Sequence, residues 1–255
     1  MHFKMIELIK KDPTVTLDEN DLWYFLGALE CNGQILKSYK IVKGDNYMLF
    51  VSCPKPDSLC TKYDSIYVER RRVILDEKFE MKVTDIGRDI ESREYCSCEN
   101  RSCLEMQTHK FDIDSVFSCP DCGRPVALYE LPLPEGQGDF CDIQLWRDNY
   151  SSMDMLWVNC LCDRYSGNQR VKSDSLLNKQ GRELAKEISH SAKIPVYYHL
   201  QEDFGMSVGF EKTDGGLIHR CPICKEVMQR RSFGKKAQID VCNSCEVSYD
   251  AIIDF

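Results

Sequence analysis

The sequence has no long apolar run. Its first ten residues place charged side chains among the apolar ones, so they lack the continuous hydrophobic segment of a signal peptide. No later stretch approaches the roughly 20 apolar residues that a membrane-spanning helix needs. We therefore expect a cytoplasmic protein without a membrane partner.

The chain also has fewer basic than acidic residues. The chain has 33 Lys and Arg residues against 41 Asp and Glu residues, which gives a net charge of −8. Proteins whose main partner is a nucleic-acid backbone usually present a basic surface. The balance argues against such a partner, although it leaves room for a local basic patch.

Histidine is scarce and scattered, with five residues at positions 2, 109, 190, 199 and 219. The chain has neither a His-x-Glu nor a His-Glu-x-x-His motif. A catalytic zinc site usually has three protein ligands and a water, often with a Glu nearby as base. We therefore predict no catalytic residues and no catalytic metal.

Cysteine, by contrast, is abundant, with 15 residues. The reducing cytosol makes disulfides an unsuitable explanation. Eight of them form two groups with the spacing of a tetrahedral zinc site, in which each short pair comes from one tight turn. The first group is Cys96, Cys98, Cys119 and Cys122, and the second is Cys221, Cys224, Cys242 and Cys245. We predict two structural Zn(II) ions per chain, one in each quartet.

The short pairs differ in detail. Gly123 follows Cys122, as expected where the turn around a metal needs a left-handed residue, but Lys225 and Glu246 stand at the equivalent positions of the second quartet. Those two turns either tolerate a non-glycine residue or have another shape. The first pair, Cys96-Ser-Cys98, is unusually tight, so Cys103 is an alternative ligand to either member.

Seven cysteines remain outside the quartets. They are Cys31, Cys53, Cys60, Cys103, Cys141, Cys160 and Cys162. Free cysteine is often buried, so most can simply fill the core. Cys160 and Cys162, with Cys141 upstream, can alternatively form a third thiolate site or a redox pair. A nucleophilic Cys160 with His190 or His199 as base is a further hypothesis.

Hydrophobic periodicity predicts an α+β fold. In the N-terminal part we expect a helix over 17–31, strands over 35–42 and 47–51, a helix over 63–78 and a strand over 81–86. Further on, 131–139 is typical of a loop, 140–172 has no clean period, 174–190 predicts a helix and 195–200 a strand. Residues 213–216 are typical of a linker.

These segments suggest three domains. They are an N-terminal α+β domain over 1–92, a central mixed α/β domain with a zinc-knuckle hairpin over 93–216, and a C-terminal zinc ribbon over 217–255.

Two segments have charge patterns that suit recognition. Basic residues surround Phe233 in the ribbon loop, where they can contact phosphates and a base; they are Lys225, Arg230, Arg231, Lys235 and Lys236. Residues 130–160 instead mix carboxylates with aromatics, which suits a basic protein partner. In both segments the alternative is structural: a solvated hairpin tip, and aromatics that belong to the core.

An ordered set of motifs resembles a known family. The set comprises Asn32-Gly-Gln-Ile-Leu36, Cys96-Ser-Cys98, Cys119-Pro-Asp-Cys122-Gly123-Arg-Pro-Val-Ala-Leu-Tyr129, Leu131-Pro132, Gln180-Gly-Arg182, Pro195-Val-Tyr-Tyr198 and Cys221-Pro-Ile-Cys224. It resembles a bacterial family of unknown function that is described as containing a zinc ribbon and as nucleic-acid-binding. The chain is also similar to bacterial double-CXXCG proteins, and its end resembles the ribbon named after a general transcription factor.

The resemblance implies binding rather than catalysis. Some double-CXXCG proteins resemble immunity partners of secreted toxins, which together with the −8 charge favours a protein partner such as a basic toxin domain. We therefore expect a non-enzymatic zinc-binding recognition protein, with nucleic-acid binding through the ribbon as the alternative.

Overall fold

The computed structural model describes the chain except for residues 37–38, 110–113, 202–209, 214–215, 234–236 and 251–255. The centre of the expected linker over 213–216, and Lys235 and Lys236 of the ribbon loop, therefore lie outside the described residues. The chain forms two compact units. The N-terminal unit contains residues 1–95 and 127–141 with a short piece near Ser115, and the second unit contains most of the rest.

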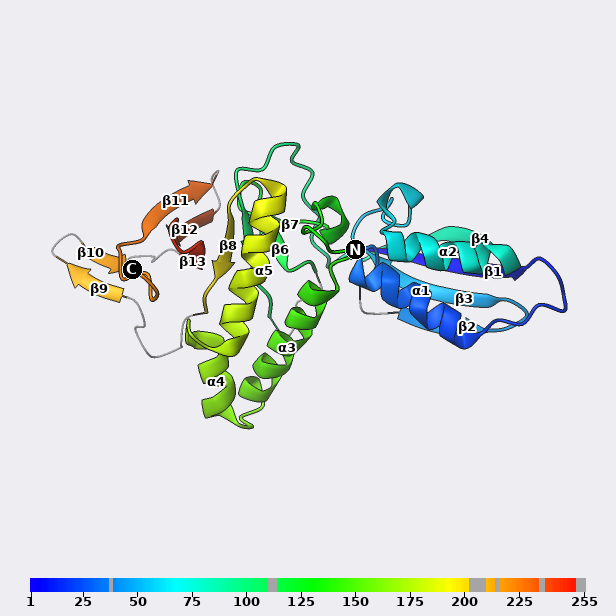
Figure 1. Cartoon of the computed structure of the whole chain (residues 1–255), viewed down its shortest axis with the longest axis horizontal. Helices are drawn as coiled ribbons and strands as arrows, with labels where there is room; N and C mark the ends of the chain where they lie inside the picture. Colours follow the sequence, from blue (N-terminus) through cyan, green and yellow to red (C-terminus); the bar gives the residue numbers. More distant parts are fainter. Residues whose placement is uncertain (37–38, 110–113, 202–209, 214–215, 234–236, 251–255) are drawn as a thin grey trace. The chain divides into compact units, whose positions relative to one another are not determined.

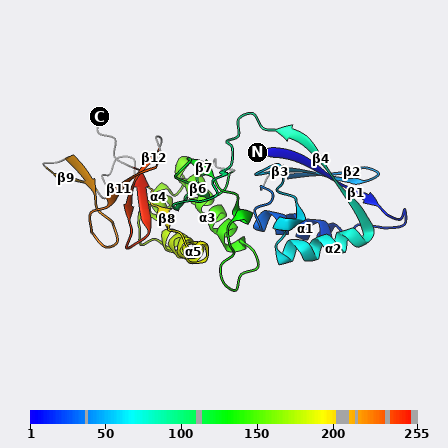
Figure 2. The ribbon, with the colours of Figure 1, turned by 90° about the horizontal axis from the view of Figure 1, so that it is seen from above.

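The N-terminal unit is a four-stranded sheet with two helices. Its elements are β1 (His2–Lys10), α1 (Glu19–Cys31), β2 (Tyr39–Lys43), β3 (Tyr47–Cys53), α2 (Ile66–Lys78) and β4 (Phe79–Arg88), with a short 3-10 helix over Thr61–Tyr63. The strand order is β2-β3-β1-β4, and every pairing is antiparallel. Both helices lie on one face of the sheet (Figure 2). This is the split βαβ arrangement of ferredoxin-like folds.

The expected order of a helix, two strands, a helix and a strand is confirmed, as is the α+β class. The prediction lacked β1, which is a central strand of the sheet. Its sequence does not alternate between apolar and polar residues, so it gives no period-two signal. An aspartate and a serine cap the N-termini of the two helices: Asp18 accepts a hydrogen bond from the Asn20 amide, and Ser65 accepts one from the Val68 amide.

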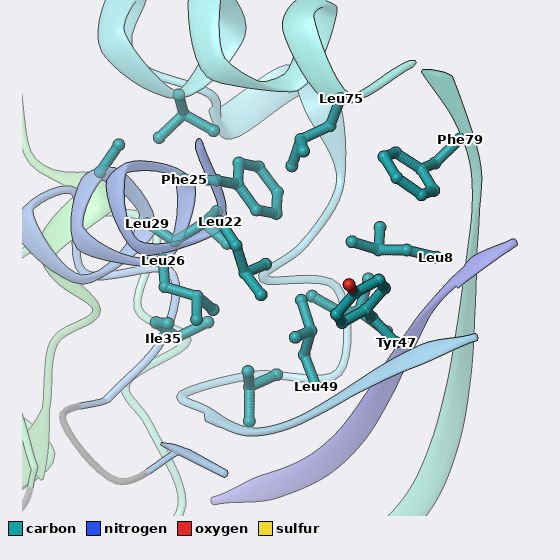
Figure 3. Packing of buried hydrophobic residues seen from close by; sticks show 14 of the residues in the cluster. Leu8, Leu22, Phe25, Leu26, Leu29, Ile35, Tyr47, Leu49, Leu75 and Phe79 are labelled. Carbon is teal, nitrogen blue, oxygen red and sulfur yellow. The ribbon is translucent and has the colours of Figure 1, made fainter. Parts of the chain in front are cut away.

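The core of this unit lies between the helices and one face of the sheet (Figure 3). Leu22, Phe25, Leu26 and Leu29 recur at helical spacing in α1 and are all buried. From the sheet they meet Leu8 of β1 and Leu49 of β3, which belong to the same buried cluster. The inward face of the sheet is therefore fixed by side chains on alternate positions.

The second unit is built on a seven-stranded sheet. Its helices are α3 (Cys141–Val158), α4 (Asp163–Val171) and α5 (Leu176–Ala192), and its strands are β5 (Leu104–Met106), β6 (Phe117–Cys119), β7 (Arg124–Pro125), β8 (Val196–His199), β11 (Gln229–Phe233), β12 (Ala237–Cys242) and β13 (Val247–Asp250). The strand order is β11-β12-β13-β8-β5-β6-β7, and β8 is parallel to both of its neighbours. Strands β9 (Phe210–Thr213) and β10 (Gly216–His219) form a separate pair. A 3-10 helix covers Leu128–Glu130 in the N-terminal unit.

Helix α5 packs along β8 (Figure 1), and the contact depends on a glycine. The rings of Tyr198 and Trp146 are fully buried and meet edge to face at 5.8 Å between centroids. A Cβ atom on Gly181 would lie 2.2 Å from the Tyr198 ring. The glycine in the Gln180-Gly-Arg182 motif therefore lets the helix approach the sheet.

The structure confirms the helix expected over 174–190 and the strand expected over 195–200. The interpretation of 140–172 as lacking a period is wrong, because α3 and α4 lie there. The buried residues of α3 are Ile143, Trp146, Tyr150 and Asp154, which do have helical spacing. Exposed apolar residues such as Leu145 and Met155 hide this pattern in the sequence.

One sheet crosses the boundary that the sequence suggested at residue 216. Strand β13 of the expected ribbon pairs with β8 of the expected central domain. The C-terminal strands thus share a hydrogen-bonded sheet with the residues before them. The division into 1–92, 93–216 and 217–255 as independently folding domains stays a prediction.

Candidate metal centres

The first quartet forms at one end of the seven-stranded sheet. The Sγ atoms of Cys96, Cys98, Cys119 and Cys122 all lie within 4.8 Å of one another. Cys119 ends β6, and the turn to β7 is closed by the Gly123 amide, which donates to the Cys119 carbonyl at 2.7 Å. Gly123 has φ of +68°, as expected for a glycine after the second cysteine of a knuckle. The Cys96 amide donates to the Pro125 carbonyl at 2.7 Å and so attaches the first pair to β7.

Hydrogen bonds to sulfur favour the thiolate form of Cys96. Burial alone would raise its pKa, but Arg101 Nε and the Cys98 amide each donate to Cys96 Sγ at 3.4 Å. These bonds outweigh burial and lower the pKa of Cys96 to about 7. The Arg101 contact was not foreseen, because a cation three residues beyond a CxC pair has no distinctive sequence signal.

Cys103 is not part of this quartet. It is fully buried in a cluster with Tyr197, Ile239 and Val241, and burial raises its pKa to about 11. Its role is that of a small core residue. Packing therefore excludes Cys103 as an alternative ligand to Cys96 or Cys98.

The second quartet has the same compactness. The Sγ atoms of Cys221, Cys224, Cys242 and Cys245 lie within 4.8 Å of one another, and those of Cys224 and Cys242 are 3.5 Å apart. Lys225 and Glu246 have φ of +67° and +53°. Both turns thus keep the left-handed conformation in spite of a non-glycine residue, at a cost of about 1 kcal/mol each.

The Cys242–Cys245 turn is attached to the parallel strands and to α5. Tyr197 Oη donates to Asn243 Oδ1 at 2.7 Å, and the Tyr198 amide donates to the Glu246 carbonyl at 2.9 Å. Ser189 Oγ of α5 donates to Glu246 Oε1 at 3.1 Å. These bonds explain how Glu246 is held in a conformation that its side chain disfavours.

Each quartet can hold one metal ion. In each quartet, two short cysteine pairs bring four Sγ atoms within 4.8 Å of one another. Four thiolates so placed are the donor set of a closed tetrahedral site. Among the described residues, no histidine or carboxylate joins either group. The structure thus brings together all eight cysteines that the sequence predicted as ligands.

The remaining candidate cysteines do not form a third quartet within the described part of the chain. Cys160 and Cys162 are exposed and both have positive φ, so the expectation that free cysteines fill the core is wrong for these two. The turn between α3 and α4 places them at the surface. Cys141 instead interacts with Cys31, and burial together with this contact raises the pKa of the Cys31 thiol.

A buried polar network lies in the centre of the sheet, and sequence reasoning missed it. Ser248 Oγ of β13 donates to Glu105 Oε1 of β5 at 2.6 Å, and His199 Nδ1 of β8 lies 3.2 Å from the same oxygen. Burial alone would raise the pKa of Glu105, but these bonds outweigh it and lower the pKa. The network thus attaches the His199 ring to a carboxylate through Nδ1.

Both charged segments make structural contacts, and the aromatics of the acidic segment belong largely to the core, as the structural alternative predicted. Trp146 and Tyr150 are buried, and the Asp154 carboxylate lies 2.9 Å from Arg170 Nε, so α3 does not present the expected acidic aromatic surface. In the ribbon loop, Arg230 Nε pairs with Asp240 at 3.0 Å. Arg231 donates to Asn243 Oδ1 at 3.0 Å, so both arginines make contacts within the ribbon.

No helix among the described residues is both long and apolar enough to cross a bilayer.

Comparison with known proteins agrees with the family expectation in part. Residues 98–201 match a family described as a domain of unknown function (DUF2310). The matched segment contains three cysteines of the first quartet and ends before the second quartet begins. An uncharacterized protein of Haemophilus influenzae is 25% identical over 185 residues, which cover 70% of this chain and 67% of that protein. Another uncharacterized protein of the same organism is 33% identical over 84 residues, which cover 32% of this chain and 39% of that protein. This chain is thus similar, through its central region, to a bacterial family of unknown function.

Proposed function

We propose that the protein is a non-enzymatic recognition protein in which each cysteine quartet holds one zinc ion. The observation that carries this proposal is the position of the quartets. Cys119 and Cys122 lie in the β6–β7 turn, Cys242 and Cys245 lie in the β12–β13 turn, and both hairpins belong to one sheet. A metal at either turn would hold an outer part of the sheet to its centre.

Zinc is the ion that this donor set favours. Four thiolates complete its tetrahedral coordination and leave no position for water or substrate. Such binding contributes about 10–16 kcal/mol in zinc-finger peptides, which is comparable to the stability of a whole domain. The proposed role of both ions is therefore structural.

A surface on α1 supports recognition of a protein partner. Trp23 and Tyr24 are 51% and 57% exposed. The Arg71 guanidinium lies 4.6 Å above the Tyr24 ring, and the ring centroids of Trp23 and Tyr39 are 6.0 Å apart. Trp, Tyr and Arg are the residues that most often dominate binding energy at protein interfaces. We call Trp23, Tyr24 and Arg71 the anchor surface.

Gly27 adds to this argument. It lies inside α1, where glycine costs about 1 kcal/mol relative to alanine. A Cβ atom built on it would meet nothing within 4 Å, so internal packing does not require glycine. Gly27 follows Trp23 and Tyr24 by four and three residues, on the same side of the helix. Its lack of a side chain would leave room for a partner beside the two aromatic rings.

Charge favours a basic partner. Helix α1 has three carboxylates, Glu19, Asp21 and Glu30, and no basic residue, and the chain as a whole has a net charge of −8. Carboxylates around aromatic anchors speed the encounter with a positively charged protein and favour it over acidic ones. A toxin domain that an immunity protein neutralises is one partner of this class.

The test combines metal analysis with binding. Protein purified without added zinc should contain two zinc ions per chain, and calorimetric titration with the basic product of an adjacent gene should give a saturable complex. Trp23→Ala and Tyr24→Ala should each weaken it by at least about tenfold. Leu176→Ala is the matched control, because Leu176 is 78% exposed in the second unit. Equal affinity for all variants would refute the anchor surface, and one zinc per chain would refute one of the centres.

A groove in the second unit favours nucleic acid as the second candidate. It has a volume of about 720 Å³ and lies between α4 and the Cys221–Lys225 turn. Arg164, Lys172 and Lys225 line it together with Trp157, against two carboxylates, Asp163 and Asp174. Cations beside an aromatic side chain suit a phosphate backbone. Gel shifts over a salt series, with Arg164→Ala and Lys172→Ala, test it: an unshifted oligonucleotide excludes this candidate.

A further inference from the structure

The outer face of the N-terminal sheet is apolar at its centre. Ile6 and Leu8 of β1 and Leu49 and Val51 of β3 point into the core, so the residues between them point outward. Those outward residues are Phe3, Met5, Glu7 and Ile9 of β1, and Met48, Phe50 and Ser52 of β3. The register places Met5 opposite Phe50 and Glu7 opposite Met48. Five of these seven outward positions are therefore apolar, and the polar ones are Glu7 and Ser52.

The edge strands are different. On β4 the outward residues are Glu80, Lys82 and Thr84, which lie opposite Ile9, Glu7 and Met5. On β2 they are Lys40 and Val42, opposite Phe50 and Met48. The face thus has an apolar centre and a largely polar edge, which is the anatomy of a protein interface.

The central strands have the sequence of a sheet that is buried on both sides. Antiparallel sheets with one solvated face usually alternate apolar and polar residues, whereas near-continuous apolar strands belong to sheets that are covered on both faces. Helices α1 and α2 cover only the inner face (Figure 2). Within the N-terminal unit, none of the described helices or strands packs on the outer one. Phe3 remains 40% exposed and Val42 43%.

Charge and area indicate what covers this face. Lys40 and Lys82 balance Glu7 and Glu80, so the face is neutral although the chain has a net charge of −8. A neutral face lacks the cations that a nucleic-acid backbone needs, and it lacks the excess carboxylates that would select a basic partner. Residues of both signs near its edge can instead pair with their own counterparts in a second copy, as in a two-fold interface.

The size of the face suits a weak dimer. Four strands at about 4.8 Å spacing over about six residues of 3.4 Å each cover about 400 Å². Two such faces bury about 800 Å² as flat areas, and the uneven surface of the side chains adds to this value. The total lies just below the roughly 1,000 Å² of a stable specific interface, in the range of weak, transient dimers.

We propose that the outer face of the β2-β3-β1-β4 sheet is a homodimer interface, in which Phe3, Met5 and Phe50 of one copy pack on the same residues of a second copy. The anchor surface is on the helical side of this unit (Figure 2), so dimerisation and partner binding use different faces.

Sedimentation velocity on the full zinc-loaded chain tests the proposal. Between about 1 and 500 µM, the mass should rise from 29.6 kDa toward twice that value, with a midpoint in the micromolar range. Phe50→Lys and Met5→Lys place a charge in the centre of the interface and should weaken dimerisation by at least about tenfold. Val73→Lys is the matched control, since Val73 is 54% exposed on α2 and should leave dimerisation unchanged.

A second measurement does not depend on how the lysine variants fold. A benzophenone amino acid in place of Phe50 should give a photo-crosslinked dimer, and the same group in place of Val73 should not. A monomer at every concentration would overturn the proposal, and so would a dimer that Phe50→Lys leaves intact. Crosslinks from position 50 to the second unit of the same chain, or to added oligonucleotide, would assign the face to another occupant and overturn it as well. Trp23→Ala should not affect dimerisation, so this result is independent of the anchor surface.

Discussion

Gly181 and Gly27 both lie inside helices, and replacing each with alanine should have opposite effects. Alanine is favoured over glycine in a helix interior by about 1 kcal/mol. At Gly27 the added Cβ meets nothing within 4 Å. Gly27→Ala should therefore stabilise the N-terminal unit by about 0.5–1 kcal/mol.

At Gly181 the same methyl group has no room. It would lie 2.2 Å from Tyr198 Cε2 and 2.8 Å from Trp146 Nε1. Neither ring can retreat easily, because Tyr198 Oη donates to Asn178 Oδ1 at 2.7 Å and Trp146 Nε1 donates to the Leu177 carbonyl at 3.2 Å. Overpacking of this kind costs about 1–3 kcal/mol, and the short distance favours the upper end. After the gain in helix propensity, Gly181→Ala should destabilise the second unit by about 1–2 kcal/mol.

Amide hydrogen exchange followed by mass spectrometry can measure both effects in one protein. Peptides from α1 and α5 report the two units separately, which avoids treating a two-unit chain as a single two-state transition. Protection should rise in α1 for Gly27→Ala and fall in α5 and β8 for Gly181→Ala. Increased protection of α5 would refute the close approach of this helix to Tyr198. Reduced protection of α1 in Gly27→Ala would contradict the conclusion that a side chain at position 27 has open space around it.

Three further predictions follow from single contacts. Cys98→Ser should remove one of two zinc ions per chain, whereas Cys103→Ser should leave the metal content measured by mass spectrometry unchanged, because that thiol is buried outside both quartets. Tyr197→Phe removes the 2.7 Å bond to Asn243 and should cost about 1 kcal/mol, with faster zinc loss to a chromogenic chelator as the readout. Burial opposes ionisation of Asp57, but hydrogen bonds from Tyr63 and Lys62 outweigh it and lower the pKa. Its carboxylate therefore stabilises the fold above its unfolded pKa of about 4, by at most about 0.5 kcal/mol after screening, and this contribution is lost as the pH falls. Urea midpoints of Asp57→Asn and wild type should differ at pH 7 and converge as the pH falls below about 4, and a constant difference would contradict the assignment.

The sequence by itself determined the features that are local along the chain. Ligand pairs separated by one or two residues can share one metal whatever surrounds them, so spacing alone identified all eight cysteines of the two quartets. Helical periodicity located α1 and α5, because each buries one regular stripe of apolar residues.

Tertiary structure decided which side of each element is covered, and by what. Period-two patterning could not reveal β1, because most of its outward residues are apolar. The period of α3 was hidden in the same way, since its exposed face also has apolar residues. Burial of Trp146 and Tyr150, exclusion of Cys103 from the first quartet and the pairing of β13 with β8 all depend on residues far apart in the sequence. A sequence pattern shows which residues share a face, but only the packing of distant segments shows whether that face is core, metal centre or open surface.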